Sequence, residues 1–401
     1  MSSQNSYIAL TSKNIQQNEL NLNEYITIDK SIADTFLLRS KIYKNDIVLS
    51  YTGEYRRALV MLENNFQLGP NICRIRPLSA DNVNSFYLSV FLNSKYGQQL
   101  LDREKTLSAQ PTVAMSRIRR LPIPILNSEI QQSITSKYLR AEELRKESFS
   151  KYKEAEDLLY KALMMDQFRI SDNNTSVKSL KNSFEKSGRL DAEYYQSKYD
   201  ELFEMLSKVD CNLIKEIKVT NYRGFQPKYV DNGKIDVINS KHILEYGLDY
   251  ENFEKTDEIS YNEVERSHVK YGDILTYTTG ANIGRTQVFL SYRKAIASNH
   301  VNMLRVKNVN PIYLALVLNS TIGRMQTERV CTGSAQAELY PDDIENFIVP
   351  ILSPHIQEEI ASLVLESYDS KKQSKLLLQE AKRMVEVEIE CHINRRLTTD
   401  G

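Results

Sequence analysis

Polar side chains that can bind phosphates and bases occur in two comparable sets along the chain. Ser, Thr, Tyr and Lys side chains bind phosphate oxygens, whereas Asn, Gln and Arg can also pair with base edges. The first set is Ser12, Lys13, Ser50, Tyr51, Thr52, Arg56, Arg57, Asn71 and Gln110. The second set is Ser240, Lys241, Tyr277, Thr278, Thr279, Asn282, Arg285, Asn299, His300 and Gln336. Any one of them could instead be a turn former, a cap or a solvated surface group, but together they favour a tandem nucleic-acid binder.

The sequence lacks the motifs that indicate catalysis or a resident metal. There is no GxxxxGK[ST] loop for nucleotide hydrolysis and no GxSxG nucleophile turn. The histidines stand alone and the 4 cysteines form no CxxC pair, which argues against a zinc site and a disulfide scaffold. Asp342 and Asp343 precede an apolar strand, but Ser116 and Arg117 occupy the matching positions of the first half. We predict that the chain is not an enzyme and binds no cofactor itself.

The composition is that of a globular protein. The chain has 401 residues, of which 41% are hydrophobic, enough for two or three domains. No stretch approaches the roughly 18 apolar residues of a membrane span, and the sparse cysteines fit a reducing cytoplasm. The charges of the 52 basic and 52 acidic side chains cancel, so the net charge does not indicate the kind of binding partner.

The two polar sets belong to an internal repeat with an offset of about 226 residues. Tyr87-Leu88 matches Tyr313-Leu314, Leu92-Asn93-Ser94 matches Leu318-Asn319-Ser320, and Pro124-Ile125-Leu126 matches Pro350-Ile351-Leu352. Each copy predicts a mixed α+β globule in which two strands, a helical stretch and a closing apolar strand follow one another. The expected ranges are 46–51, 72–75, 87–101 and 121–126 in the first copy, and 273–277, 301–306, 313–325 and 347–352 in the second.

A long helix follows each globule. Ser128 and Gln131 suggest a capping box for the first, and Ser353 before Pro354 marks the start of the second. Apolar residues then recur at a heptad-like spacing, which predicts that the helices pair as an antiparallel coiled coil; an exposed helix or an oligomerisation coil is the alternative. The predicted seam consists of Ile134, Tyr138, Ala141, Tyr152, Ala155 and Leu159 on the first helix, and Ile360, Val364, Leu378, Ala381 and Val385 on the second.

The predicted architecture is therefore two tandem recognition domains separated by two long helices with pseudo-two-fold symmetry. The expected segments are a first domain (1–127), a first helix (128–168), a linker (169–188), a second domain (189–352) and a second helix (353–396). Residues 189–234 have no counterpart in the first copy, so we expect the first domain to be shortened at its N-terminal side.

This layout resembles the DNA specificity subunit of type I restriction–modification systems over nearly the whole chain. The resemblance is carried by Arg189-Leu-Asp-Ala-Glu-Tyr-Tyr195, Gly272-Asp-Ile-Leu275, Gly280 with Gly284-Arg285, Ser298-Asn-His300, Gly333-Ser-Ala-Gln336 and Ile356-Gln-Glu-Glu-Ile360. It implies two target recognition domains, each reading one half of a split double-stranded DNA site, with the paired helices as the spacer.

The resemblance also implies partners. These are two modification (methyltransferase) subunits and, for cleavage, ATP-dependent restriction subunits, so S-adenosylmethionine, ATP and magnesium would bind the partners only. Two alternatives stay open: the specificity chain of a related system whose partner fuses methylase and nuclease, and a coiled-coil scaffold with two protein-binding domains.

Overall fold

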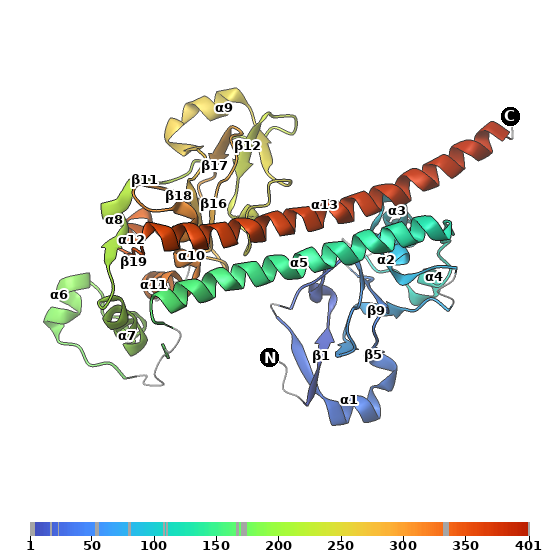
Figure 1. The fold of residues 1–401 in the computed structure, drawn as a ribbon, viewed down its shortest axis with the longest axis horizontal. Helices are drawn as coiled ribbons and strands as arrows, with labels where there is room; N and C mark the ends of the chain where they lie inside the picture. The colour runs from blue at the N-terminus through green and yellow to red at the C-terminus, as the bar shows by residue number, and fades with distance from the viewer. Residues whose placement is uncertain are drawn as a thin grey trace. The chain divides into compact units, whose positions relative to one another are not determined.

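The computed structural model describes residues 5–16, 18–22, 24–52, 56–78, 82–106, 109, 111–165, 168–169, 175–331 and 337–399. The chain forms two compact units. Unit 1 comprises Met1–Lys146 and Ser370–Gly401, and unit 2 comprises Glu147–Asp369. Each unit thus contains one α+β globule and a portion of each of two long helices (Figure 1).

The globule of unit 1 is built from two small sheets and the helices that cover them. One sheet has the strand order β4-β1-β8-β5, the other β7-β6-β9, and β2 pairs with β3. The strands are β1 Ser6–Leu10, β2 Ile15–Gln16, β3 Glu19–Leu20, β4 Ile26–Asp29, β5 Lys41–Ile42, β6 Ile47–Ser50, β7 Ala58–Val60, β8 Phe66–Leu68 and β9 Ile72–Ile75. The helices are η1 Ser12–Asn14, α1 Lys30–Phe36, η2 Leu38–Ser40, α2 Ser85–Asn93, α3 Lys95–Arg103 and α4 Met115–Ile118.

The globule of unit 2 repeats this plan and adds to it. Its sheets have the orders β13-β12-β17-β14 and β11-β18-β15-β16, and β10 pairs with β19. The strands are β10 Cys211–Leu213, β11 Lys218–Arg223, β12 Ile235–Ile238, β13 Glu254–Thr256, β14 His268–Val269, β15 Ile274–Tyr277, β16 Thr286–Val288, β17 Ala295–Ala297, β18 Val301–Val306 and β19 Ile348–Pro350. The helices are η3 Leu180–Asn182, α6 Phe184–Ser187, η4 Ala192–Tyr195, α7 Ser197–Leu206, α8 Ile214–Ile217, η5 Ser240–His242, α9 Glu258–Glu263, η6 Glu265–Ser267, α10 Pro311–Asn319, α11 Thr321–Cys331 and α12 Pro341–Glu345.

Matching buried hydrogen bonds show that the repeat is structural. Asn93 is buried and its amide bonds both backbone groups of Ala58, while the equivalent Asn319 bonds both backbone groups of Thr286. The Tyr313 hydroxyl donates to the Pro350 carbonyl at 2.9 Å, and the Tyr87 hydroxyl donates in the same way in unit 1. Because an unpaired buried polar group is costly, these matched pairs fix the α2 and α10 helices on their sheets in one orientation.

A buried carboxylate closes the turn before β15 in unit 2. Asp273 is 1% exposed, receives the guanidinium of Arg305 through two bonds of 2.7 Å, and accepts from the Lys270 backbone N–H at 2.8 Å. The hydrogen-bonded pair raises the pKa of Arg305 above its ordinary value. Asp46 and Arg76 make the same bidentate pair before β6 in unit 1.

Removing this carboxylate should destabilise unit 2. We expect Asp273→Ala to lower the free energy of unfolding by about 3 kcal/mol, because the change leaves a half-buried guanidinium and a backbone donor unpaired. Chemical denaturation of the full chain measures the loss. Glu258→Ala, which removes a pair between two exposed side chains with Lys294, is the control and should change stability little; equal effects would contradict the structural role of Asp273.

The two long helices are α5 (Ser128–Ala162) and α13 (Pro354–Thr399). In unit 1 they run antiparallel, because Lys137 pairs with Glu380 while the later residue Ala141 accepts a bond from the earlier residue Ser374. In unit 2 Ser148 lies 3.1 Å from Ser367 between the two helices, where both are buried. All predicted seam residues are buried except Leu378, which is partly buried against the same core as Ala381.

The start of α5 differs from the predicted capping box. The Asn127 side chain caps the helix by accepting from the Ile130 N–H at 2.9 Å. Gln131 instead donates to the Leu126 carbonyl and accepts from the Asn84 N–H, so it ties the helix to the loop before α2. Gln357 does the same for α13, with Leu352 and Asn310 as its partners. The glutamine thus docks the helix rather than capping it.

The predicted closing strand at 121–126 is the clearest error in the fold. The equivalent β19 of unit 2 is a strand because β10 pairs with it. Within the described residues, unit 1 has no counterpart of β10 or β11, so residues 121–126 are irregular and β9 is the edge of its sheet. In the part of the chain that is described, no helix combines the length and apolarity needed to cross a bilayer.

Candidate nucleic-acid interface

The loop between β15 and β16 places several predicted residues at one rim of unit 2. Tyr277 and Arg285 are joined by a backbone bond of 2.8 Å at the base of this loop, and Gly280 and Gly284 turn it with φ values of 94° and 85°. The Arg285 guanidinium donates to the Asn282 Oδ1 at 2.8 Å. Because Asn282 is exposed, the loop presents an amide and a guanidinium to the surroundings.

A second loop meets this one. His300 follows β17 and accepts, through its carbonyl, a bond from the Thr278 N–H, while its Nδ1 lies 3.0 Å from the Thr279 hydroxyl. Asn299 and His300 are both exposed. The imidazole and the hydroxyl therefore stand beside the Arg285 loop as further groups that can donate or accept hydrogen bonds. We name Tyr277, Thr279, Asn282, Arg285, Asn299 and His300 the unit 2 rim.

Arg223 and Tyr340 lie beside the unit 2 rim, although the repeat does not reveal them. Arg223, at the end of β11, pairs with Glu338, and its guanidinium lies 4.8 Å from the Tyr340 ring centroid. Glu338 bridges to Thr279, and hydrogen bonds from Tyr340 and Arg223 lower the pKa of the Glu338 carboxyl. Arg223 lies in a segment that the first copy lacks, so it has no matching position in the repeat.

Ser240 and Lys241 form part of the turn after β12. This turn follows Ile238, whose carbonyl accepts from the Ser298 N–H, so it adjoins the loop that carries Asn299 and His300. Lys241 is exposed, but its ammonium pairs with Glu254. Lys241 therefore contributes less free positive charge than the sequence suggests.

Three predicted contact residues do not fit that role because they are buried. Thr278 is 0% exposed, Ser50 is 2% exposed and its hydroxyl accepts from the Arg57 N–H, and Arg56 is 1% exposed and pairs with Asp102. Sequence alone could not separate them from their exposed neighbours, because the strand ends and turns that hold them alternate between buried and exposed positions. They position the loops rather than reach a ligand.

The rim of unit 1 has the same backbone frame. Tyr51 donates its N–H to the Asn71 carbonyl, as Thr278 does to His300, and Tyr51 accepts from Val113 as Thr278 accepts from Leu339. Thr52 bridges to Thr112 where Thr279 bridges to Glu338. Asn71 is exposed and has a φ of 66°.

The remaining candidates of unit 1 are spread around this frame. Lys13 is exposed in η1, next to the partly exposed Ser12, and the Arg57 guanidinium donates to Gln16. Gln110 and Gln336, the predicted glutamines of the two sets, lie outside the described residues.

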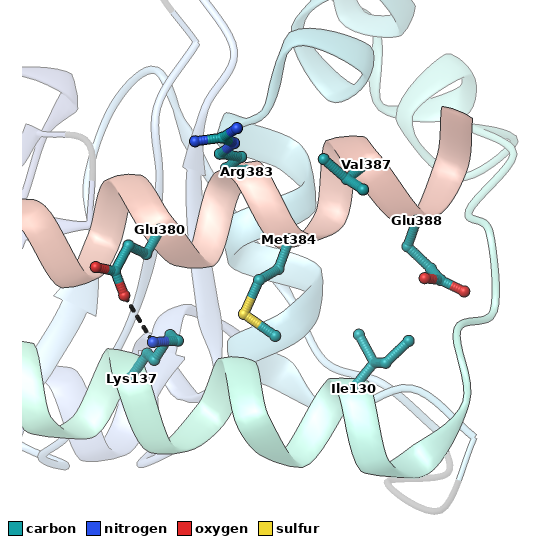
Figure 2. A pocket seen from close by; sticks show the side chains of 7 residues that line it. All are labelled: Ile130, Lys137, Glu380, Arg383, Met384, Val387 and Glu388. Atoms are coloured by element: carbon teal, nitrogen blue, oxygen red, sulfur yellow. Dashed lines mark hydrogen bonds and ion pairs between the residues drawn. The ribbon is translucent and has the colours of Figure 1, made fainter. Parts of the chain in front are cut away.

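A pocket of about 430 Å³ lies between α5 and α13 within unit 1. Ile130, Met384 and Val387 supply its apolar surface, and Lys137, Glu380, Arg383 and Glu388 line it as well (Figure 2). The Lys137–Glu380 ion pair joins the two helices at 2.7 Å. The lining therefore combines aliphatic side chains with one ion pair between the helices. Among the described residues, no group of three or more His, Cys, Asp and Glu side chains could hold a metal ion.

Comparison with solved structures gives matches at low sequence identity, with TM-scores below 0.5. The chain is similar to the type I restriction-modification S subunit from M. genitalium (13% identity, 95% of this chain and 90% of that one, TM-score 0.47). It is also similar to the HsdS subunit from Thermoanaerobacter tengcongensis (13% identity, 95% and 89%, TM-score 0.30). A third similar chain comes from a structure of type I R-M complex assembly (12% identity, 94% and 89%, TM-score 0.33). A search of curated proteins found no match.

The family comparison is more direct. Residues 214–380 match the model of the type I restriction modification DNA specificity domain, a range that begins at α8 and ends within α13. It contains the entire unit 2 rim. Residues 214–380 therefore form a type I restriction modification DNA specificity domain.

Proposed function

We propose that the chain recognises a bipartite DNA site, with the unit 2 rim reading one half-site and the equivalent loops of unit 1 reading the other. The observation that carries this proposal is the shared backbone frame, in which Tyr51, Asn71 and Val113 repeat the bonds of Thr278, His300 and Leu339. A chain that carries the same loop frame twice is suited to bind two related ligand segments. The two halves of a split DNA site are such segments.

The rim of unit 2 has the groups that such reading requires. Arg285 and Asn282 can pair with base edges in the major groove, and Thr279 and Tyr277 can bind phosphate oxygens. Arg223, stacked on Tyr340, is held beside them by Glu338. Phosphate contacts would supply affinity that falls with salt, and the base contacts would supply the preference for one sequence.

The helices supply the spacing in this proposal. The rise of an α-helix is about 1.5 Å per residue, so helices of this length can hold two recognition domains a fixed number of base pairs apart. A change in that number also rotates one half-site about the duplex axis, which makes a rigid spacer selective. Linking the domains turns the second binding event into an intramolecular one.

We further propose that modification subunits pack on the paired helices, with the pocket around Met384 as one contact. Methylation would require a base to be flipped from the stack into the partner's own site. S-adenosylmethionine, and the ATP and magnesium of the restriction subunits, would then bind those partners. In this proposal, the chain itself only positions the modification and restriction subunits on the DNA.

DNA binding by the reconstituted complex tests the function. With its modification subunits, the full chain should bind one bipartite duplex at least about a thousandfold more tightly than unrelated DNA of the same length. The affinity should fall steeply between low and physiological salt, since phosphate contacts release counterions. Binding that ignores sequence, or a complex that assembles with no DNA preference, would contradict the proposal and favour a protein-binding scaffold.

A further inference from the structure

The sheet edge that β9 forms in unit 1 is covered in unit 2. There, β11 pairs antiparallel with β18, with Asn221 opposite Leu304 and Arg223 opposite Asn302. The β6–β9 pair of unit 1 corresponds to the β15–β18 pair of unit 2, because Ile47 lies opposite Ile75 as Ile274 lies opposite Leu304. Among the described residues of unit 1, no strand takes the place of β11 beside Ile75. A strand edge of this kind leaves backbone donors and acceptors ready to pair.

An apolar surface next to this edge is also covered in one unit only. In unit 2, Phe347 and Val349 are 4% and 0% exposed and share a core with Ile214 and Ile217 of α8. The matching Leu121 and Ile123 of unit 1 are only partly buried. The next apolar residue, Ile125, is 68% exposed. Within the described ranges, neither the edge of β9 nor this surface has a counterpart of the segment that covers them in unit 2, which is β10–α8–β11.

The charge beside the edge differs between the units. In unit 2, Lys218 at the start of β11 pairs with Glu345 at the end of α12. At the equivalent position after α4, unit 1 has Arg119, which is exposed. A second copy of β11 would thus bring a lysine against an arginine, whereas a segment with a carboxylate at that position would form an ion pair. The β11 of this chain is also held in place, because Asn221 accepts a bond of 2.7 Å from Asn302.

We propose that the edge of β9 is a docking site for an extended segment of another polypeptide, which adds an antiparallel strand and places an acidic side chain against Arg119. The bound segment covers Leu121 and Ile123 as α8 covers their counterparts. The β7-β6-β9 sheet of unit 1 thereby gains the fourth strand that β11 supplies in unit 2. Main-chain hydrogen bonds supply the affinity of such strand addition, and the charge selects the occupant.

Two synthetic peptides test the proposal on the full-length chain without DNA. One has the sequence of residues 208–224, and the other is identical except for Lys218→Glu. Fluorescence anisotropy of the labelled peptides should show about five- to tenfold tighter binding of the Lys218→Glu peptide at low salt, since its charge attracts rather than repels Arg119. Hydrogen exchange should show slower exchange of the backbone amides at residues 72–76 when the peptide is bound.

Charge reversal on the protein makes the assignment specific. Arg119→Glu should invert the preference, so that the unmodified peptide binds more tightly, whereas the neighbouring Arg120→Glu control should leave the order unchanged. Absence of peptide binding, or binding that protects other strands, would overturn the proposal. So would sedimentation showing that the chain dimerises through this edge, with β9 amides protected only in the dimer, because the occupant would then be a second copy.

Discussion

Placing a carboxylate in the helix seam with Ala381→Glu should strongly lower the stability of unit 1. Ala381 is 0% exposed and belongs to the core that contains Ile134, Tyr138 and Val385. A charge there loses its hydration among apolar side chains, so we expect the free energy of unfolding to fall by about 4 kcal/mol. Thermal and chemical denaturation of the full chain measure the effect.

Lys372→Glu is the matched control for the seam. It changes charge on the same helix at an exposed position, so stability should change little. Leu378→Glu should fall between the two, because Leu378 is only partly buried. If all three variants were equally stable, α13 would not pack in unit 1 through this face, and the spacer role of the helices would lose its basis.

Arg285→Ala should weaken recognition of one half-site. The guanidinium stands at the unit 2 rim, and its bond to Asn282 orients it without burying it. Loss of a bidentate base contact costs about 1–3 kcal/mol, which corresponds to a roughly 5- to 150-fold loss of affinity for the preferred sequence. Competition binding with duplexes altered at single positions of each half-site measures this loss.

The control for Arg285 is Arg266→Ala. Arg266 is exposed in η6 of the same unit but is not part of the rim. It should leave the sequence preference unchanged. If Arg285→Ala lowered affinity equally for every duplex, the guanidinium would be a phosphate contact; if it had no effect, Arg285 would not belong to the interface.

The repeat predicted most of the fold because its identities mark buried structural bonds. Asn93 and Asn319 recur because each satisfies the same two backbone groups. The helical stretches predicted at 87–101 and 313–325 are present, but each consists of two helices, α2 and α3 in unit 1 and α10 and α11 in unit 2. Ser94 and Ser320 end α2 and α10, and each hydroxyl bonds a carbonyl of the helix it ends. A short apolar helix followed directly by an amphipathic one gives a single periodic pattern of apolar residues. The sequence pattern therefore does not show where the first helix ends.

The errors arose where tertiary contacts decide the outcome. Residues 121–126 have a strand-like apolar pattern, yet a strand forms only where β10 pairs with the equivalent segment in unit 2. Gln131 has the residue type and spacing of a capping box but bonds Asn84 and Leu126 instead. Both outcomes depend on distant segments, which local patterns do not encode.

The sequence predicts where the loops of the candidate interface lie, but not which of their side chains are exposed. Residue type and repeat position located the loops of Tyr277, Arg285 and His300, which the structure brings to one rim. Exposure could not be predicted, so the buried Arg56 and Thr278 were included with them. Arg223 was missed because it lies outside the repeat.

Mapping of methylated bases in a host that expresses the chain with its modification subunit tests the central proposal most directly. We expect methylation at one bipartite motif with a fixed spacer, and Arg285→Ala should relax one half of that motif while the other half and the spacer stay unchanged. Methylation at a single continuous motif, or a pattern that does not depend on the chain, would contradict recognition by two domains.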